Sequence, residues 1–289
     1  MARRKPATTH GLAVVDKPAG VTSHDVVGML RRRFGERQVG HAGTLDPDAT
    51  GVLVVAVGKA TRLLRFVEKT RKGYVGEVVL GSSTSTLDSS GDVLATFDMS
   101  GVTLDDARTA AAEHLLGDIE QVPPMVSAIR VDGKRLHELA REGIEIERAP
   151  RPVTVHRFDV VDWAEPGVLA IDVECSAGTY IRTLADDLGR LLGGGAHLRN
   201  LRRTHVGEFT LAEAAHPDEC ELLPVASAVR GLAAVTVSDD VAALVANGRV
   251  LGAWDGDGPW AIFDGRAQLL AVYEMFGDGQ AKPAVVLAV

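Results

Sequence analysis

HAGTLDPDATG, residues 41–51, leads directly into VLVVAV, the apolar run at 52–57 that predicts a buried strand. Proline restricts the residue before it to extended or turn conformations, so Asp46 is expected in a loop rather than a helix. Gly43 and Gly51 bracket this loop and allow a ligand to approach its backbone closely. Loops held by a rigid strand often carry catalytic groups, which makes Asp46 a candidate. For the Asp-Pro pair alone, an Asx-type turn is the structural alternative.

Further blocks extend this signal along the chain. In order they are DKPAGVTSHDVV at 16–27, RKGYVGEVVLG at 71–81, VPPMVSAIRVDGKRLHELAREG at 122–143, GTYIRTLADDLG at 178–189 and GAHLRNLRRTHVG at 195–207. Together with HAGTLDPDATGVLVVAVGKATR they resemble the TruB-type tRNA pseudouridine synthases, and an ordered set of blocks is far more specific than one motif. The resemblance implies an isomerase that converts the T-loop uridine at tRNA position 55 to pseudouridine, on a base flipped out of the RNA.

Composition limits the class of protein. The chain has 289 residues, of which 46% are hydrophobic and 24% charged, as in ordinary soluble globular proteins. Its apolar runs are too short to cross a bilayer, and residues 1–10 lack the apolar core of a secretory signal. Cys175 and Cys220 show no metal-ligand spacing and suit a reducing compartment. We therefore expect a cytoplasmic protein.

Charge is distributed unevenly. The net charge of −8 and the pI near 5.6 argue against a protein that coats nucleic acid without specificity. Basic side chains nevertheless cluster beside the blocks, at residues 31–33, at 69, 71 and 72, at 148, 151 and 157, and at 199, 202 and 203. A solvated surface is the plain interpretation of any one cluster. If the clusters serve RNA binding, Arg202 and Arg203 are expected to contact phosphates.

The order of predicted elements favours an α+β fold with a mixed, largely antiparallel sheet flanked by helices, because strands and helices alternate without regular βαβ repetition. Capping and apolar spacing predict helices at 22–34, 103–117 and 179–192. Strand patterns fall at 52–57, 73–80, 92–98 and 169–175.

Two domains are expected. Residues 1–224 would form the catalytic domain, within which the Pro-rich and charged segment at about 121–152 resembles the family's RNA-binding thumb. Several short strands follow, and Asp264-Gly265 is a hairpin signal, so residues 225–289 predict a small β-barrel. The resemblance implies that this second domain is PUA-like.

The resemblance also implies the catalytic residues. Asp46 would act as nucleophile or base, and Tyr74 would belong to the same catalytic group. A buried carboxylate needs a nearby cation to remain ionised, and Arg182 in GTYIRTL matches the family's arginine that supplies it. An i,i+4 ion pair between Arg182 and Asp186 on one helix is the alternative for that arginine.

Further positions would bind the substrate. Tyr74 matches the tyrosine that packs on the target base, and Tyr180 and Leu201 match other pocket positions. His41 matches the residue that stacks where the extruded nucleotide stood. Lys17 would support the catalytic loop, although a solvated lysine is nearly as good an interpretation.

The expected reaction needs no external group. Moving uracil from a nitrogen to a carbon linkage involves no redox change, so we expect neither cofactor nor metal, and the sequence contains no P-loop, HExxH or CxxC motif. We expect a monomer that binds the tRNA T-arm without a protein partner. Three alternatives stay open: a tRNA-binding or tRNA-folding protein in which catalysis is secondary, a guide-RNA-dependent relative of box H/ACA particles, and, more weakly, a glycosidase with a second carboxylate.

Overall fold

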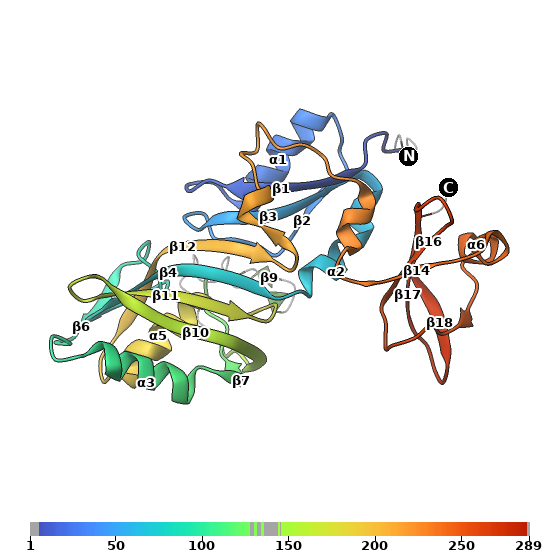
Figure 1. Cartoon of the computed structure of the whole chain (residues 1–289). Helices are drawn as coiled ribbons and strands as arrows, with labels where there is room; N and C mark the ends of the chain where they lie inside the picture. The colour runs from blue at the N-terminus through green and yellow to red at the C-terminus, as the bar shows by residue number, and fades with distance from the viewer. Residues whose placement is uncertain (1–5, 128–129, 132–133, 136–143, 145, 288–289) are drawn as a thin grey trace.

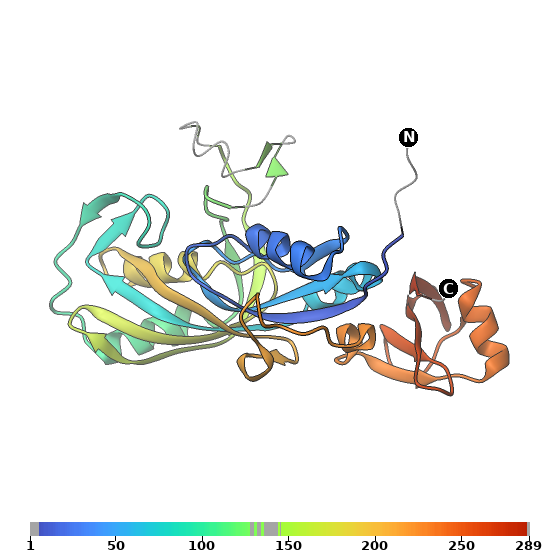
Figure 2. The ribbon, with the colours of Figure 1, turned by 90° about the horizontal axis from the view of Figure 1, so that it is seen from above.

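The computed structural model describes residues 6–127, 130–131, 134–135, 144 and 146–287. A large mixed sheet carries helices, and a smaller sheet built from the C-terminal residues lies at one end of it (Figure 1, Figure 2). The large sheet runs in the order β1 (Gly11–Lys17), β3 (Thr50–Val57), β12 (Ala196–Val206), β4 (Lys72–Leu80), β11 (Val168–Cys175), β10 (Arg151–Glu165), β7 (Gly117–Gln121), with β2 (Val39–Ala42) beside β3 and β13 (Phe209–Thr210) beside β12. All neighbours are antiparallel except β12 and β3, which confirms the predicted α+β class.

Two of the helices, α1 (Ser23–Phe34) and α3 (Leu104–His114), begin where the capping signals place them. The others are α2 (Leu64–Glu68), α5 (Ile181–Leu191) and α6 (Asp239–Ala246), with 3₁₀ turns η1 (Gly58–Leu63), η2 (Leu211–Glu213) and η3 (Val225–Val229). Thr22 and Thr103 each form a capping box with the aspartate three residues later. The predicted start of α5 at Thr179 is wrong, because the Thr179 hydroxyl donates to the Ser176 carbonyl and the helix begins at Ile181.

Strand β3 is buried on both faces, which explains its unbroken apolar sequence. Leu53, Val55 and Val57 pack with α1 and β1 in one core cluster. Val52 and Val54 face the other side and pack in a second cluster, together with apolar residues of η1, α2, η3 and the C-terminal sheet. A strand fixed from both sides holds the preceding loop rigidly in place.

The smaller sheet has the order β14 (Ala233–Thr236), β16 (Trp260–Phe263), β17 (Leu269–Met275), β18 (Gln280–Val286) and β15 (Leu251–Gly252). It curls around a core that contains Trp260 and Tyr273, with the Trp254 ring edge-on to both, and is PUA-like as predicted. An ion pair of 2.9 Å between Arg65 and Glu274 links it to α2. The boundary at residue 224 stays a prediction.

Two short strand pairs complete the description. Strand β5 (Ser82–Thr84) pairs with β6 (Val93–Thr96), and β8 (Arg130–Val131) pairs with β9 (Lys134–Arg135). Strands β8 and β9 belong to the predicted thumb, and most of the thumb between 128 and 145 lies outside the described residues. Its RNA-binding role therefore stays a prediction.

Strands β10 and β12 are elements that pattern analysis of the sequence missed. Register shifts interrupt β10 in its pairing with β11 and β12 in its pairing with β4, so neither strand keeps a strict alternation of apolar and polar residues. In β12, moreover, Leu201 and Arg203 line a cavity, although Leu201 also packs against the edge of the apolar core. Strand β12 lies between β3 and β4 and brings these side chains next to the loop at 41–51.

Candidate active site

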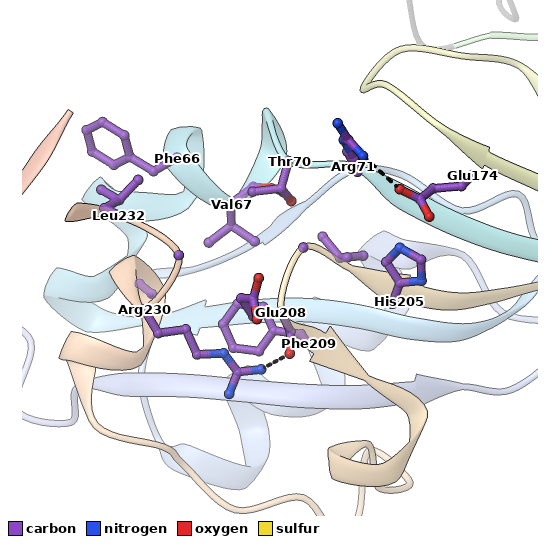
Figure 3. Close-up of a pocket in the computed structure, with 14 residues that line it drawn as sticks. Phe66, Val67, Thr70, Arg71, Glu174, His205, Glu208, Phe209, Arg230 and Leu232 are labelled. Atoms are coloured by element: carbon purple, nitrogen blue, oxygen red, sulfur yellow. Dashed lines mark hydrogen bonds and ion pairs between the residues drawn. The ribbon is translucent and has the colours of Figure 1, made fainter. Parts of the chain in front are cut away.

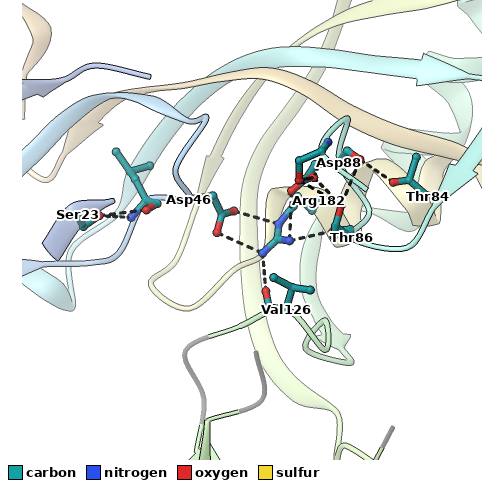
Figure 4. Close-up of polar contacts among 9 residues, drawn as sticks. Ser23, Asp46, Thr84, Thr86, Asp88, Val126 and Arg182 are labelled. Atoms are coloured by element: carbon teal, nitrogen blue, oxygen red, sulfur yellow. Dashed lines mark hydrogen bonds and ion pairs between the residues drawn. The ribbon is translucent and has the colours of Figure 1, made fainter. Parts of the chain in front are cut away.

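The loop that carries Asp46 joins β2 to β3 and is fixed from two sides. The Ser23 hydroxyl, at the start of α1, accepts from the Leu45 amide at 2.9 Å and donates to the Leu45 carbonyl at 3.1 Å (Figure 4). The Lys17 ammonium, at the end of β1, donates to the Pro47 carbonyl at 2.8 Å and to the Val21 carbonyl at 2.6 Å. Lys17 is fully buried, so the solvated alternative for it is wrong.

Arg182 and Asp46 form the central ion pair of the site. The guanidinium Nε lies 3.0 Å from one Asp46 oxygen and Nη2 lies 3.4 Å from the other (Figure 4). Asp186, the alternative partner, pairs instead with Arg190 at 2.8 Å. Two guanidinium nitrogens thus face the two oxygens of one carboxylate, which fixes the orientation of the acid.

Arg182 has three further partners. It donates to the Thr86 carbonyl at 2.9 Å and to the Val126 carbonyl at 2.8 Å, and it makes an ion pair of 3.3 Å with Asp88. Asp88 is held in turn by hydroxyl groups, since Thr86 and Ser90 both donate to it at 2.6 Å. One buried guanidinium thus serves two carboxylates.

Burial dominates the acidity of Asp46. Protein surrounds the carboxylate except toward a cavity, where 41% of its side chain is exposed, and this desolvation raises its pKa. The Arg182 guanidinium opposes that rise, whereas Asp88 adds to it. A carboxylate whose pKa lies above its ordinary value is a better proton acceptor than a free aspartate, and the arginine keeps the ionised form accessible.

The cavity beside Asp46 has a volume of about 500 Å³, enough for a nucleotide. Three of the predicted substrate-site residues line it together with Asp46 and Arg182, namely Tyr74, Tyr180 and Leu201. Desolvation raises the pKa of both tyrosines, so their phenols are neutral near pH 7. A second cavity, of about 460 Å³, shares Asp46, Arg182 and Leu201 and opens toward Asp88.

His41 lies apart from these residues. It belongs to β2 and is not among the residues lining the cavity beside Asp46. Its Nδ1 is buried and has no hydrogen-bond partner in the described part of the chain, and desolvation lowers its pKa. A neutral ring with an unsatisfied nitrogen is available for an additional contact.

Sequence reasoning did not place three charged residues in this site. Asp88 stands in TSTLDSSGD, a segment with the composition of a turn, where its carboxylate accepts from the Ser90 amide. Lys72 and Arg203 also line the cavity. The prediction that Arg203 contacts RNA phosphates is wrong, because its side chain is 1% exposed and is bonded to the Val52 carbonyl at 2.7 Å. Arg202 pairs with Asp16 at 2.7 Å and remains at the surface.

Another cavity, of about 310 Å³, lies on the opposite face of the same strands (Figure 3). Residues alternate between faces along a strand, so Arg71 and His205 point into it while Lys72 and Tyr74 point toward Asp46. Its apolar wall includes Phe209, over which the Arg230 guanidinium lies at 3.9 Å. None of the predicted site residues lines this cavity.

The described residues contain no group of three or more His, Cys, Asp or Glu side chains arranged to hold a metal ion. In the same part of the chain, no helix is long and apolar enough to span a membrane.

Comparison with known proteins identifies the family. The model of the TruB family pseudouridylate synthase N-terminal domain matches residues 31–181, and that of the tRNA pseudouridylate synthase B C-terminal domain matches residues 182–223. The tRNA pseudouridine synthase B of Rhodococcus jostii is 46% identical, with 99% of this chain and 97% of the relative covered, and that of an Arthrobacter species is 47% identical, with 96% of each covered. This chain belongs to the TruB family of pseudouridylate synthases.

A solved structure shares the fold. It is described as an H/ACA RNP bound to a substrate RNA containing 2′-deoxyuridine. The two chains are 25% identical with a TM-score of 0.69, and the match covers 92% of this chain and 78% of the other. The pseudouridine-synthase fold predicted from the sequence is confirmed.

Proposed function

We propose that this enzyme converts the uridine at position 55 of the tRNA T-loop to pseudouridine, with Asp46 acting as nucleophile or base on the flipped-out nucleotide. The bacterial relatives with 46% and 47% identity are named for activity on tRNA, which supports tRNA as the substrate. The single observation that carries the proposal is the Asp46–Arg182 pair, at 3.0 Å, on the wall of a cavity that two tyrosines also line.

The geometry suits the reaction. The C1′–N1 bond of uridine breaks, the base turns, and a C1′–C5 bond forms while the C5 proton moves away. Asp46 is the carboxylate that faces the cavity with its charge partner already in place, so it is positioned to attack a carbon or to take a proton. Tyr74 supplies an aromatic surface for the base, and Tyr180 and Leu201 enclose it.

Access to the base requires extrusion from the folded T-arm. Flipping a nucleotide costs about a few kcal/mol in lost stacking and pairing. His41 precedes the catalytic loop and presents a neutral, partly buried ring, which supports a role in replacing the lost stacking. We propose that tRNA is the only partner needed and that the enzyme acts as a monomer in the cytoplasm. Sedimentation of the active enzyme with and without tRNA measures the oligomeric state.

Asp46→Asn tests the proposal directly. The amide keeps the shape of the carboxylate but removes its charge and basicity, so pseudouridine formation should be abolished while tRNA affinity stays within about a few-fold. The measurement maps pseudouridine in an unmodified tRNA transcript after incubation with each protein. Appreciable turnover by Asp46→Asn would refute the catalytic role. Product at a uridine other than position 55 would refute the site assignment alone.

The same variant also tests the alternative function, a tRNA-folding protein in which catalysis is secondary. Under that alternative, Asp46→Asn would refold tRNA as well as the wild type does. We expect both the wild type and the variant to bind tRNA, but only the wild type to modify it.

A further inference from the structure

Two buried cations line the cavity beside Tyr74. Arg203 is 1% exposed and Lys72 is 5% exposed. They come from adjacent strands, β12 and β4, and Arg203 stands directly opposite Tyr74 in the register of these strands. Lys72 precedes Tyr74 by two residues, so its side chain leaves β4 on the same face. Both cations therefore lie on the side of the sheet where the target base is expected.

Neither cation is neutralised by an acid. Lys72 donates to the Glu68 and Thr70 carbonyls at 2.7 and 3.0 Å. Arg203 donates to the Val52 and Gly43 carbonyls at 2.7 and 3.0 Å. Apart from the Tyr74 hydroxyl, which is also hydrogen-bonded to the Arg203 side chain, these acceptors are main-chain oxygens, and no carboxylate within the described ranges forms an ion pair with either side chain.

The other ionisable groups nearby do not cancel the charge. Cys175 lies opposite Lys72 on β11, and burial raises the pKa of its thiol to about 11, so it is neutral. The Tyr74 phenol is neutral as well. The Glu68 carboxylate lies at the surface, although its charge favours protonated Lys72. Asp46 is already paired with Arg182. The charged side chains that line the cavity are three cations, Lys72, Arg182 and Arg203, and two carboxylates, Asp46 and Glu68, so one positive charge is in excess.

Such an arrangement is costly to the folded protein. A charge removed from water without a counter-charge loses several kcal/mol of solvation, which main-chain carbonyls repay only in part. Positive groups kept in this way beside a reaction cavity are suited to a negative charge that arises during the reaction, since fixed charges act most strongly where water is excluded.

We propose that Lys72 and Arg203 stabilise the negative charge that develops on the uracil ring, either when its bond to the ribose breaks or when the ring is activated before that bond breaks. The inference rests on the proposed function. When the C1′–N1 bond breaks, its electron pair leaves with uracil and the charge spreads over N1, O2 and O4. Asp46 compensates the sugar by bonding to C1′ or by taking the C2′ proton. If Asp46 instead adds to C6, the ring becomes an enolate with its charge on O4.

All three routes end with Asp46 free again, because C5 displaces it from C1′, or it returns the proton to C2′, or it leaves C6 after the C1′–C5 bond has formed. In each route C5 uses an electron pair to bond C1′ and loses its proton, and N1 gains one, so the product is an isomer of the substrate. The ring is negative at some stage of each route, and the cation pair faces it beside Tyr74. A phosphate is a poorer fit, because side chains exposed by only 1% and 5% lie in the cavity wall rather than at its rim.

The test varies both the cation and the base. Lys72→Met removes the charge at nearly constant size, Lys72→Arg restores it, and Lys282→Met removes an exposed lysine of the smaller sheet as the control. Each protein is assayed in single turnover on a T-arm RNA carrying uridine or 5-fluorouridine at the target position. Fluorine withdraws electrons and stabilises a negative ring, so the fluorinated substrate needs less help. The disappearance of the N-linked nucleoside is measured by nuclease digestion, chromatographic separation of the isomeric nucleosides and mass spectrometry.

We expect Lys72→Met to lose about 10²-fold on uridine, the usual effect of deleting one anion-stabilising donor, and less than about tenfold on 5-fluorouridine. Lys72→Arg should recover most of the rate, and Lys282→Met should resemble the wild type. Lys72→Met should also unfold at the same or a higher temperature, because an uncompensated charge has been removed. Arg203→Lys, which retains a charge near the Val52 carbonyl, should lose less on both substrates than Arg203→Met.

Several outcomes would overturn the inference. Equal losses on the two substrates, or a lower unfolding temperature that accounts for the loss, would make Lys72 structural. Weaker tRNA binding with an unchanged single-turnover rate would assign the pair to a phosphate. If the wild type itself formed no pseudouridine on the uridine substrate, the proposed function would have failed instead.

Discussion

Arg182→Met removes the guanidinium that holds Asp46 and should slow the chemical step severely. The side chain makes ion pairs of 3.0 Å with Asp46 and 3.3 Å with Asp88, and both carboxylates would then stand together without their cation. Removing one partner of a buried ion pair costs about 3–5 kcal/mol, and each 1.36 kcal/mol is tenfold in rate. Because 41% of the Asp46 side chain is open to the cavity, the lower end applies, about 10²-fold.

The same change predicts a direction for the pH dependence. Burial raises the pKa of Asp46, and Arg182 opposes that rise, so the pKa rises further when the arginine is lost. If the ionised carboxylate is the active form, the acid limb of the rate profile must move to higher pH in Arg182→Met. Part of the lost rate should then be recovered by raising the pH.

Single-turnover assays on a T-arm transcript, repeated across pH and salt, measure these effects. tRNA affinity and its salt dependence should stay near wild type, since Arg182 is paired with carboxylates rather than exposed to phosphates. An unchanged rate with weakened tRNA binding would refute the reasoning, as would an acid limb that did not move. Circular dichroism of the variant controls for loss of the fold.

Further predictions concern substrate opening, surface charge and buried lysines. His41→Ala should slow modification of a structured T-arm more than of a short unstructured oligonucleotide, because an unstacked base needs less help, and equal losses would reassign His41. If Arg202 can leave Asp16 to bind a phosphate, Arg202→Ala should reduce the salt dependence of tRNA affinity by about one phosphate contact. An unaltered salt dependence would show that Arg202 stays paired with Asp16. Burial lowers the pKa of Lys17 and Lys72 from 10.5 to about 8, so the unfolded chain binds more protons between these values. The free energy of unfolding measured in urea should therefore rise as pH increases from about 8, and it should rise less steeply in Lys72→Met than in the wild type. Equal slopes of unfolding free energy against pH in the two proteins would contradict the burial of the Lys72 charge.

The sequence was informative wherever local chemistry determines structure. Thr22 and Thr103 predicted the helix starts through their capping boxes, and the unbroken apolar run at 52–57 predicted a strand covered on both faces. The family resemblance predicted Asp46, Arg182 and Tyr74 as one catalytic group, and all three line the same cavity. These are short-range signals or motifs that a linear sequence can carry.

The remainder depends on tertiary contacts that pattern analysis does not reveal. Arg202 and Arg203 are neighbours with the same side chain, yet Arg202 pairs with Asp16 at the surface and Arg203 is buried beside the cavity. Alternation along β12 separates them, and that strand could not be recognised from its interrupted pattern. Asp88 reaches Arg182 from a segment nearly a hundred residues earlier, so their pairing depends on the fold.

The number of hydrogen-bond donors on Arg182 limits which groups it can contact. A guanidinium has five N–H groups, and those of Arg182 face four protein partners: the carboxylates of Asp46 and Asp88 and the carbonyls of Thr86 and Val126. Its side chain is only 5% exposed. We therefore expect Arg182 to act on the substrate through Asp46, unless a partner is released. Among its partners, Val126 lies in the segment that leads into the predicted thumb, so a displacement of that segment on tRNA binding would free a donor next to Asp46.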